Sequence, residues 1–247
     1  MANFVDVHRQ RVTTPGAPRW PLRWLPNRLW PGRGRAPGTR PGSAAAGERL
    51  VLRDGSAVLI RQVRPSDAPL VAAGFARLSA RSRRMRFLYG KDKLSAAELR
   101  YLTNVDHFDH EALGALDHPG GRGVGVARYV RDTADPRSAE IAVTIVDDGQ
   151  GLGLATELLA RLSERARAAG IRRFTALVAE DNAAMAGLLR KVRADRVGRN
   201  GGTADYEITL AQPASASQVA ASQSSSASRK ARGCSYCGTW PASATST

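Results

Sequence analysis

Two glycines, Gly151 and Gly153, stand where a β-branched segment gives way to a stretch rich in alanine and leucine. The segment reads DDGQGLGLATELL over residues 147–159, so the glycines occupy the junction between an expected strand and an expected helix. At a helix N-terminus several backbone N–H groups lack a partner within the helix and lie at the positive end of its dipole. Glycines leave room for an anion to approach that backbone, and Gln150 adds a side-chain donor. The two glycines alone are explained more simply by a plain strand-to-helix turn, with a phosphate site as the alternative.

Two familiar phosphate motifs do not fit this segment. A P-loop requires a glycine, four residues and then Gly-Lys-Ser/Thr, which is absent here. A dinucleotide-binding turn requires Gly or Ala where Thr156 stands and an acidic residue about 20 positions on. Glu180 instead comes 29 positions after Gly151, and the chain beyond it is too short to complete a doubly wound sheet.

The strand expected before this turn, residues 139–146, carries one carboxylate. The period of two in a strand separates its side chains into a less apolar face and an aliphatic face. The first face holds Glu140, Ala142 and Thr144, and the second holds Ile141, Val143 and Ile145. We expect the aliphatic face to pack on the core, which leaves Glu140 on the face open to chemistry.

Further elements must position these residues. Ser66 or Asp67 is expected to cap the first helix, and Ser95 with Glu98 forms a capping-box pattern for the second. The expected order is a strand at 55–64, helices at 65–79 and 95–103, strands at 110–117, 121–132 and 138–148, a helix at 153–169, a strand at 171–179, a helix at 182–192 and a strand at 204–210. This order predicts an α+β fold, a mostly antiparallel sheet with helices on both faces.

Composition divides the 247 residues into three parts. Residues 1–47 are rich in Pro, Arg and Trp, and residues 212–247 are mostly Ser, Ala, Thr and Gln, so we expect both to be disordered tails. Residues 48–211 are expected to form one domain. Two-thirds of the net charge of +15 lies in the tails, which argues against a folded nucleic-acid-binding module.

The tails hold two features of their own. Trp20, Trp24 and Trp30 among arginines suit docking on an anionic surface, although the neighbouring prolines exclude a continuous helix. Cys234 and Cys237 form a C-x-x-C without further metal ligands nearby, so no metal site is expected. No run of 18 apolar residues and no secretory signal is present, which predicts a cytoplasmic protein.

The segment QGLGLA, Gln150 to Ala155, resembles the Gln/Arg-x-x-Gly-x-Gly/Ala signature of the GNAT superfamily of acyl-CoA N-acetyltransferases. The resemblance extends over residues 57–210 and includes LSARSRRMRFLYG, LSAAELRYLTNVDHFDHEALGAL and AEIAVTIVDDGQGLGLATELL. These blocks are most similar to bacterial protein-lysine acetyltransferases and their stand-alone relatives. The resemblance implies a sheet splayed between its fourth and fifth strands, acetyl-CoA as co-substrate and an amine acceptor, possibly a protein lysine.

The resemblance also implies a donor site. The turn would hold the pyrophosphate, the fourth strand would polarise the thioester carbonyl, and the start of the last helix would add an asparagine. The residues implied are Val143, Thr144, Ile145, Gln150, Gly151, Leu152, Gly153, Leu154, Ala155 and Asn182.

Related lysine acetyltransferases use a glutamate in the fourth strand as general base, which assigns that role to Glu140, directly or through a water. The alternative is a solvated or ion-paired strand glutamate. The sequence departs from the family where Leu189 replaces a general-acid tyrosine, and where Arg193 and Ala194 replace a Gly-Phe pair. Because of these departures, a non-catalytic acyl-CoA sensor is the alternative function. A small amine is the alternative acceptor.

Two polar clusters are further candidates for a functional role, and each also has a purely structural interpretation. Asp106, Asp109 and Glu111 are candidates for attracting a cationic acceptor, and His107 or His110 for an alternative base, but a polar loop surface is the simpler interpretation. The second cluster is Arg81, Arg83, Arg84 and Arg86, for which a solvated helix face competes with binding of the 3′-phosphate of CoA.

Overall fold

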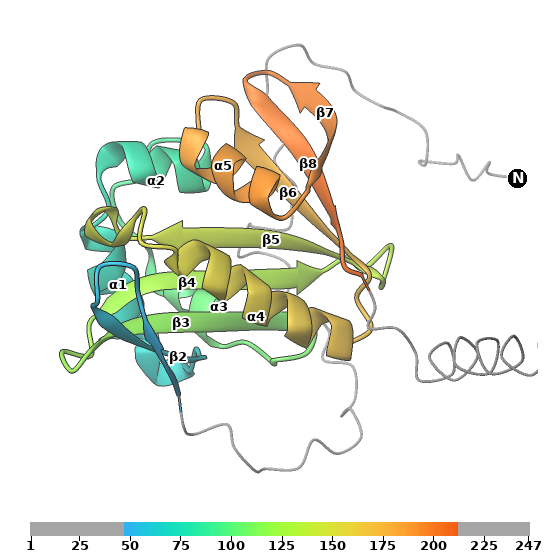
Figure 1. Ribbon diagram of the computed structural model, residues 1–247. Coiled ribbons are helices and arrows are strands. Elements are labelled where there is room, and N and C mark those ends of the chain that lie inside the picture. The colour runs from blue at the N-terminus through green and yellow to red at the C-terminus, as the bar shows by residue number, and fades with distance from the viewer. Residues whose placement is uncertain (1–46, 212–247) are drawn as a thin grey trace, which may run out of the picture. The chain divides into compact units, whose positions relative to one another are not determined.

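The computed structural model describes residues 47–211; the tryptophan and cysteine features of the tails lie outside these residues. An eight-stranded sheet in the order β1-β2-β3-β4-β5-β6-β8-β7 forms the centre of this domain (Figure 1). The strands are β1 (Glu48–Val51), β2 (Ala57–Gln62), β3 (His110–His118), β4 (Gly123–Arg131), β5 (Ser138–Ile145), β6 (Arg173–Ala179), β7 (Asp195–Asn200) and β8 (Thr203–Thr209). The helices are α1 (Ala68–Ala76), α2 (Ala80–Phe87), α3 (Ala96–Thr103), α4 (Leu154–Ala168) and α5 (Ala183–Lys191), with short 3-10 turns η2 (Pro65–Asp67) and η3 (Asp147–Gly149).

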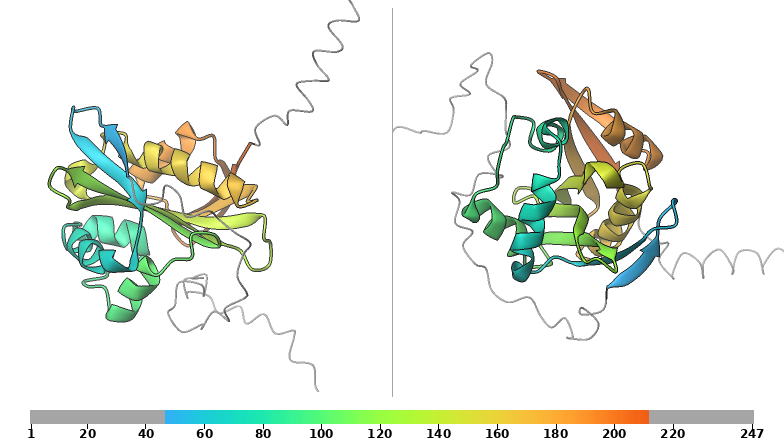
Figure 2. Two further views of the ribbon diagram at one scale, coloured as in Figure 1. Left: turned by 90° about the horizontal axis from the view of Figure 1, so that it is seen from below. Right: turned by 90° about the vertical axis from the view of Figure 1, so that its left-hand side faces the viewer.

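The sheet is antiparallel except between β5 and β6, and helices cover both of its faces. Figure 2 shows α4 and α5 on one side, with α1, α2 and α3 on the other. The α+β architecture predicted from the element order is confirmed. The capping box of Ser95 and Glu98 at the start of α3 is also present.

The main core lies between α4 and the sheet. Leu154, Leu158 and Leu162 recur every fourth residue and are at most 1% exposed, so they form one stripe along α4. They pack with Ile141 of β5 and Phe174 of β6 in the same apolar cluster. Each such leucine contributes about 1.5–3 kcal/mol through burial. This packing fixes the start of α4 relative to β5.

Three elements go beyond the expected order. The segment of α2 has no apolar period, and it forms a helix because Ser79 caps it by accepting the N–H of Ser82. The edge strand β1 is only four residues long and mostly exposed. The other edge strand, β7, is polar and has an irregular register at Arg196/Gly198, so its sequence shows no regular alternation of apolar residues.

The sheet opens between β5 and β6. Only Ser138, Ala139 and Glu140 of β5 are paired with β6, opposite residues 173–175, although β5 continues to Ile145. Beyond Glu140 the edge of β5 that faces β6 is therefore unpaired. This is the splay between the fourth and fifth strands that the resemblance implied.

Candidate active site

The turn before α4 has the backbone geometry that only glycine adopts readily. Gly151 and Gly153 have φ angles of +79° and +94°, in the left-handed region that L side chains rarely occupy. Gly153 is the N-cap of α4, and no side chain caps this helix. The glycines are therefore required by conformation as well as by the space they leave.

Five consecutive amides at this turn are open. Within residues 47–211, no protein acceptor is bonded to the backbone N–H groups of Gly151, Leu152, Gly153, Leu154 or Ala155. The next amide, that of Thr156, already bonds to the Gly153 carbonyl at 3.0 Å. Open amides at the positive end of a 15-residue helix form an anion-binding surface.

Gln150 is engaged within the protein. Its Nε2 atom donates to the Ile145 carbonyl at 3.2 Å and to Ser82 Oγ at 3.3 Å. The side chain thus joins the turn to β5 and α2, a role that its sequence position did not indicate.

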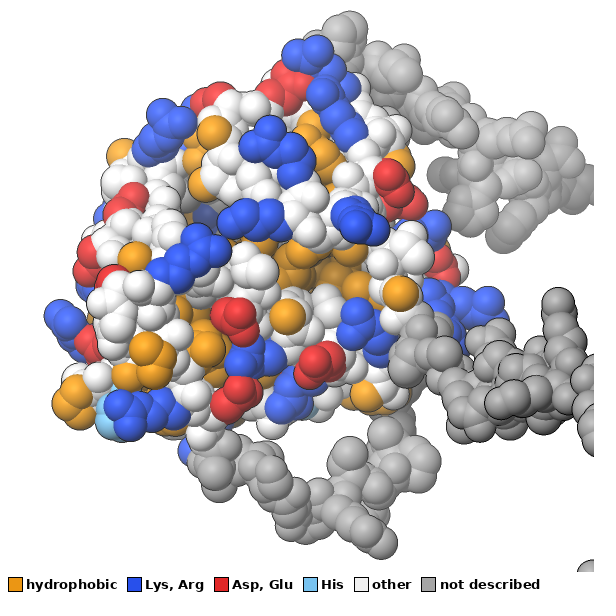
Figure 3. Space-filling view, in the orientation of Figure 1, with side chains coloured by type: hydrophobic (Ala, Val, Ile, Leu, Met, Phe, Trp, Pro, Cys, Tyr) orange, Lys and Arg blue, Asp and Glu red, His pale blue; other side chains and the backbone are white. Residues whose placement is uncertain are grey.

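A basic side chain that sequence reasoning missed lies beside the turn. A Cβ atom built on Gly153 would lie 3.4 Å from the side-chain Nε of Arg53. The backbone N–H of Arg53 donates to the Leu152 carbonyl oxygen, with 3.4 Å between nitrogen and oxygen. Arg53 is exposed and, within the described domain, has no carboxylate partner. Arg53 follows β1, a strand that the sequence did not predict, so no sequence pattern indicated that its side chain lies beside the turn. Basic side chains are spread over the face that carries α4 and α5 (Figure 3).

The unpaired edge of β5 presents amides to the splay. The N–H of Val146 bonds to the Val124 carbonyl of β4, and successive residues of a strand point to opposite sides. The amides of Val143 and Ile145 therefore face the gap. The amide of Thr144 faces β4, and its side chain lines a cavity on the other face of the sheet.

Glu140 lies on the face of β5 away from α4, as the alternation predicts. It is half-buried, whereas Ile141 is only 4% exposed and belongs to the core beneath α4. The guanidinium of Arg86 on α2 is close enough for the Glu140 charge to act on it. Burial lowers the pKa of Arg86, and the charges of Glu140 and Tyr101 oppose that shift in part, which leaves the pKa at about 10.

Helix α2 spans the open end of the splay. Ser79 and Ser82 at its start bond to the carboxylate of Asp147, which follows β5. Arg84 forms an ion pair with Asp181, which follows β6. The arginine cluster of the sequence is thus not uniformly solvated, because Arg83 also donates to the Leu78 carbonyl at 2.9 Å.

Two positions compared with the family, Asn182 and Leu189, have roles within the fold. The Oδ1 atom of Asn182 caps α5 by accepting the Met185 N–H at 3.0 Å. Leu189 is 1% exposed and lies in the core, so its position presents no acid to a substrate.

The acidic loop before β3 is an internal network. Asp106 accepts the N–H groups of Phe108, Asp109 and His110. Asp109 of the same loop forms an ion pair of 2.6 Å with Arg131 at the end of β4.

The remaining three candidates of this segment are also engaged. Glu111 is 1% exposed and is bonded to His107 Nδ1 at 2.7 Å and to Gln62. Burial lowers the pKa of His110 to about 3, helped by the nearby charge of Arg128. The polar-loop interpretation fits these contacts better than acceptor recruitment.

Between residues 47 and 211, no group of three His, Cys, Asp or Glu side chains is arranged to hold a metal ion. None of the helices described is long and apolar enough to cross a bilayer.

Comparisons with known proteins bear on the family and the fold. Residues 57–195 match the family described as acetyltransferase (GNAT) domain. An acetyltransferase of Pseudomonas aeruginosa is 37% identical over 147 residues, which are 58% of this chain and 78% of that protein. Acetyltransferase Pat of Mycolicibacterium smegmatis is 34% identical over 147 residues, 60% of this chain but only 42% of its own length. The crystal structure of the GNAT domain of S. lividans PAT has a TM-score of 0.62 at 29% identity, covering 66% of this chain and 96% of that one.

Proposed function

Since the chain belongs to the GNAT acetyltransferase family and is an acyl-CoA-dependent N-acetyltransferase, we propose that it moves an acetyl group from acetyl-CoA to a protein lysine. The lysine is favoured by the sequence blocks that resemble protein-lysine acetyltransferases. The similarity to acetyltransferase Pat supports the same direction. This chain matches less than half of the length of that relative.

The observation that carries the proposal is the run of open amides from Gly151 to Ala155. A diphosphate placed there accepts several N–H donors and meets the positive end of the α4 dipole. Arg53, beside Gly153, adds a charged donor. Asn182, whose oxygen caps α5, keeps its amide nitrogen for the donor molecule.

The pantetheine arm then lies in the gap between β5 and β6. In that position the thioester carbonyl accepts from the amides of Val143 and Ile145, which stabilise the charge that develops on oxygen during attack. The amine nitrogen bonds to the acyl carbon, the carbon–sulfur bond breaks, and CoA leaves as a thiolate. A free thiol of pKa about 8.5 needs only about 2 kcal/mol of help to leave as a thiolate at pH 7, so Leu189 at the usual acid position is tolerable.

The attacking amine must first lose a proton. With an ordinary pKa of about 10.4, the neutral form of lysine costs about 4.6 kcal/mol at pH 7. We assign the base to Glu140, which lies at the last paired position of β5, where the gap begins. It takes the proton directly or through one water and passes it to solvent.

Two measurements test this function. Calorimetry should detect acetyl-CoA binding to the purified protein, and a thiol-release assay should detect CoA when lysine peptides are added. Failure of the folded protein to bind CoA at all would refute the donor site. Binding without thiol release to any peptide or small amine would favour an acyl-CoA sensor, and release with small amines alone would replace the protein lysine.

A further inference from the structure

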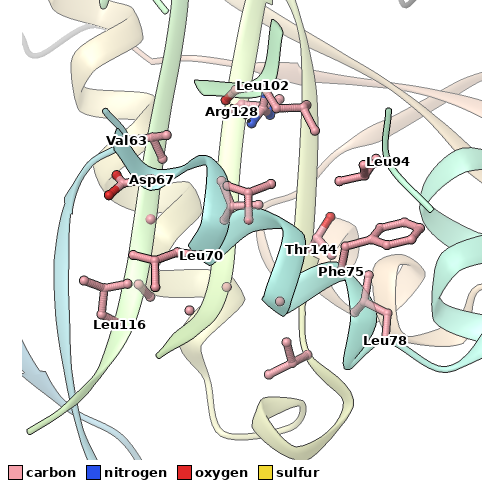
Figure 4. Close-up of a pocket in the computed structure, with 18 of the residues that line it drawn as sticks. Val63, Asp67, Leu70, Phe75, Leu78, Leu94, Leu102, Leu116, Arg128 and Thr144 are labelled. Carbon is pink, nitrogen blue, oxygen red and sulfur yellow. Dashed lines mark hydrogen bonds between the residues drawn. The ribbon is translucent and has the colours of Figure 1, made fainter. Parts of the chain in front are cut away.

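A cavity of about 100 Å³ lies on the face of the sheet opposite α4, among α1, α2, α3 and strands β3 to β5. Figure 4 shows side chains of α1, the sheet and the segment before α3 around it. Most of its walls are apolar, and Gly114, Gly123 and Gly125 supply a floor without side chains. The apolar wall is formed by Val63, Leu70, Phe75, Leu78, Leu94 and Leu102.

A buried cation lines this apolar space. Arg128 of β4 is 2% exposed, and its guanidinium donates to the Leu102 carbonyl at 2.9 Å and approaches His110 Nε2 at 3.2 Å. Both partners are neutral, because the pKa of His110 lies at about 3. Within residues 47–211, Arg128 has no ion pair with Asp or Glu. Burial and, after it, the nearby charge of Arg86 lower the pKa of Arg128 to about 9 against an opposing effect of Tyr101, as expected for a buried guanidinium without a carboxylate partner.

The charges around the cavity do not balance. Arg61 and Asp67 also line it, but they neutralise each other in an ion pair of 2.6 Å. Arg86 lines it as well, and the Glu140 charge acts on its guanidinium. One positive charge, that of Arg128, is left in a largely apolar space. A buried charge of this kind is stabilised by a counter-ion, and a ligand is the remaining source.

The cavity lies next to the expected position of the transferred group. Arg128 is paired with Ala142 of β5, and the Thr144 side chain lines the cavity. The amides of Val143 and Ile145, which are proposed to hold the thioester carbonyl, alternate with Ala142 and Thr144 along β5. An acyl chain that starts at the β5 edge therefore has the cavity within reach of its next few carbons.

We propose that this cavity binds the acyl chain of a donor that ends in a carboxylate, a CoA thioester of a short dicarboxylic acid such as succinyl-CoA. The carboxylate pairs with Arg128, with Arg86 beside it, and the methylene groups contact the apolar wall. The inference rests on the proposed donor site and names its acyl group. It leaves the amine acceptor and the chemistry of transfer unchanged.

The test compares two donors of equal length, butyryl-CoA and succinyl-CoA, with acetyl-CoA as the reference. Calorimetry on the full chain should give a dissociation constant at least about tenfold lower for succinyl-CoA than for butyryl-CoA, because a buried charge-assisted pair replaces a methyl group. R128M should lose that difference while keeping the affinity for acetyl-CoA. R86Q serves as the second variant if R128M fails to fold, and it should reduce the difference. Arg100→Gln on α3, an exposed arginine that does not line the cavity, is the matched control and should preserve it.

The outcomes separate this inference from the proposed function. Equal affinities for succinyl-CoA and butyryl-CoA, with acetyl-CoA still bound, would overturn the acidic acyl group and leave the acetyltransferase intact. A preference that survives both arginine variants would also overturn it. Absence of binding by all three thioesters would instead refute the donor site itself.

Discussion

Arg53 and Gly153 are neighbours in space although 100 positions separate them: a methyl group added at Gly153 would lie 3.4 Å from Arg53 Nε. The contact joins the turn between β1 and β2 to the start of α4. It places an exposed guanidinium beside the open amides proposed to hold a diphosphate.

Arg53→Gln should therefore raise the Michaelis constant for acetyl-CoA by about three- to tenfold with little change in turnover, since an exposed charge contact contributes modestly. The sensitivity should vanish with acetyl-pantetheine, which lacks the phosphates. Arg49→Gln, an exposed arginine on β1, is the matched control. Equal loss with both donors would contradict a phosphate contact.

Gly153→Ala should destabilise the protein by about 1–3 kcal/mol, because alanine at a φ of +94° is strained. Gly187→Ala in α5 is the matched control, since its Cβ would meet nothing within 4 Å. That control should leave stability unchanged or raise it by up to about 1 kcal/mol. Urea unfolding measures both, and similar stability changes in the two variants would show that the turn is not constrained.

The sequence predicts those parts of the fold that rest on local patterns. The alternation in residues 139–146 assigns Glu140 and Ile141 to opposite faces, because the period of two follows from backbone geometry alone. The capping pattern of Ser95 fixes the start of α3 for the same reason. By contrast, α2 is stabilised by Asp147 from 65–68 positions away, and no local pattern records such a partner.

The site shows the same limit. The glycine turn was predictable because its conformation requires particular residues in a short stretch. Arg53 and Arg128 were not, since each acts through long-range contacts. The one available signal for Arg128 was a charged residue at an inward position of an apolar strand, in the segment GVGVARYVR.

Stability should depend on pH through His110. Its folded pKa of about 3 lies below the ordinary value of 6.5, so between these values the unfolded chain binds more protons than the folded one. Lowering the pH from 6.5 toward 3 should therefore reduce the free energy of unfolding by up to about 1.4 kcal/mol per pH unit from this group. His110→Gln should flatten that slope while keeping an acceptor for Arg128. An NMR titration of His110 with a midpoint near pH 6.5 would contradict the buried neutral ring.

Glu140→Gln should reduce turnover by about a hundredfold at pH 7 while leaving the affinity for acetyl-CoA nearly unchanged. Glutamine preserves the size of the side chain but accepts no proton, and the role proposed for Glu140 concerns the amine rather than the phosphates. Glu164→Gln on the exposed face of α4 is the matched control and should keep full turnover.

The pH profile gives the Glu140 prediction its sharpest form. As the pH approaches the ordinary lysine pKa of about 10.4, a growing fraction of the acceptor is already neutral and needs no base. The deficit of Glu140→Gln should therefore narrow steadily between pH 7 and pH 10 in thiol-release assays with a lysine peptide. A deficit that is constant over this range would mean that Glu140 positions substrate or holds Arg86 instead of removing the proton. Turnover equal to that of the unmodified enzyme at pH 7 would remove Glu140 from the mechanism altogether.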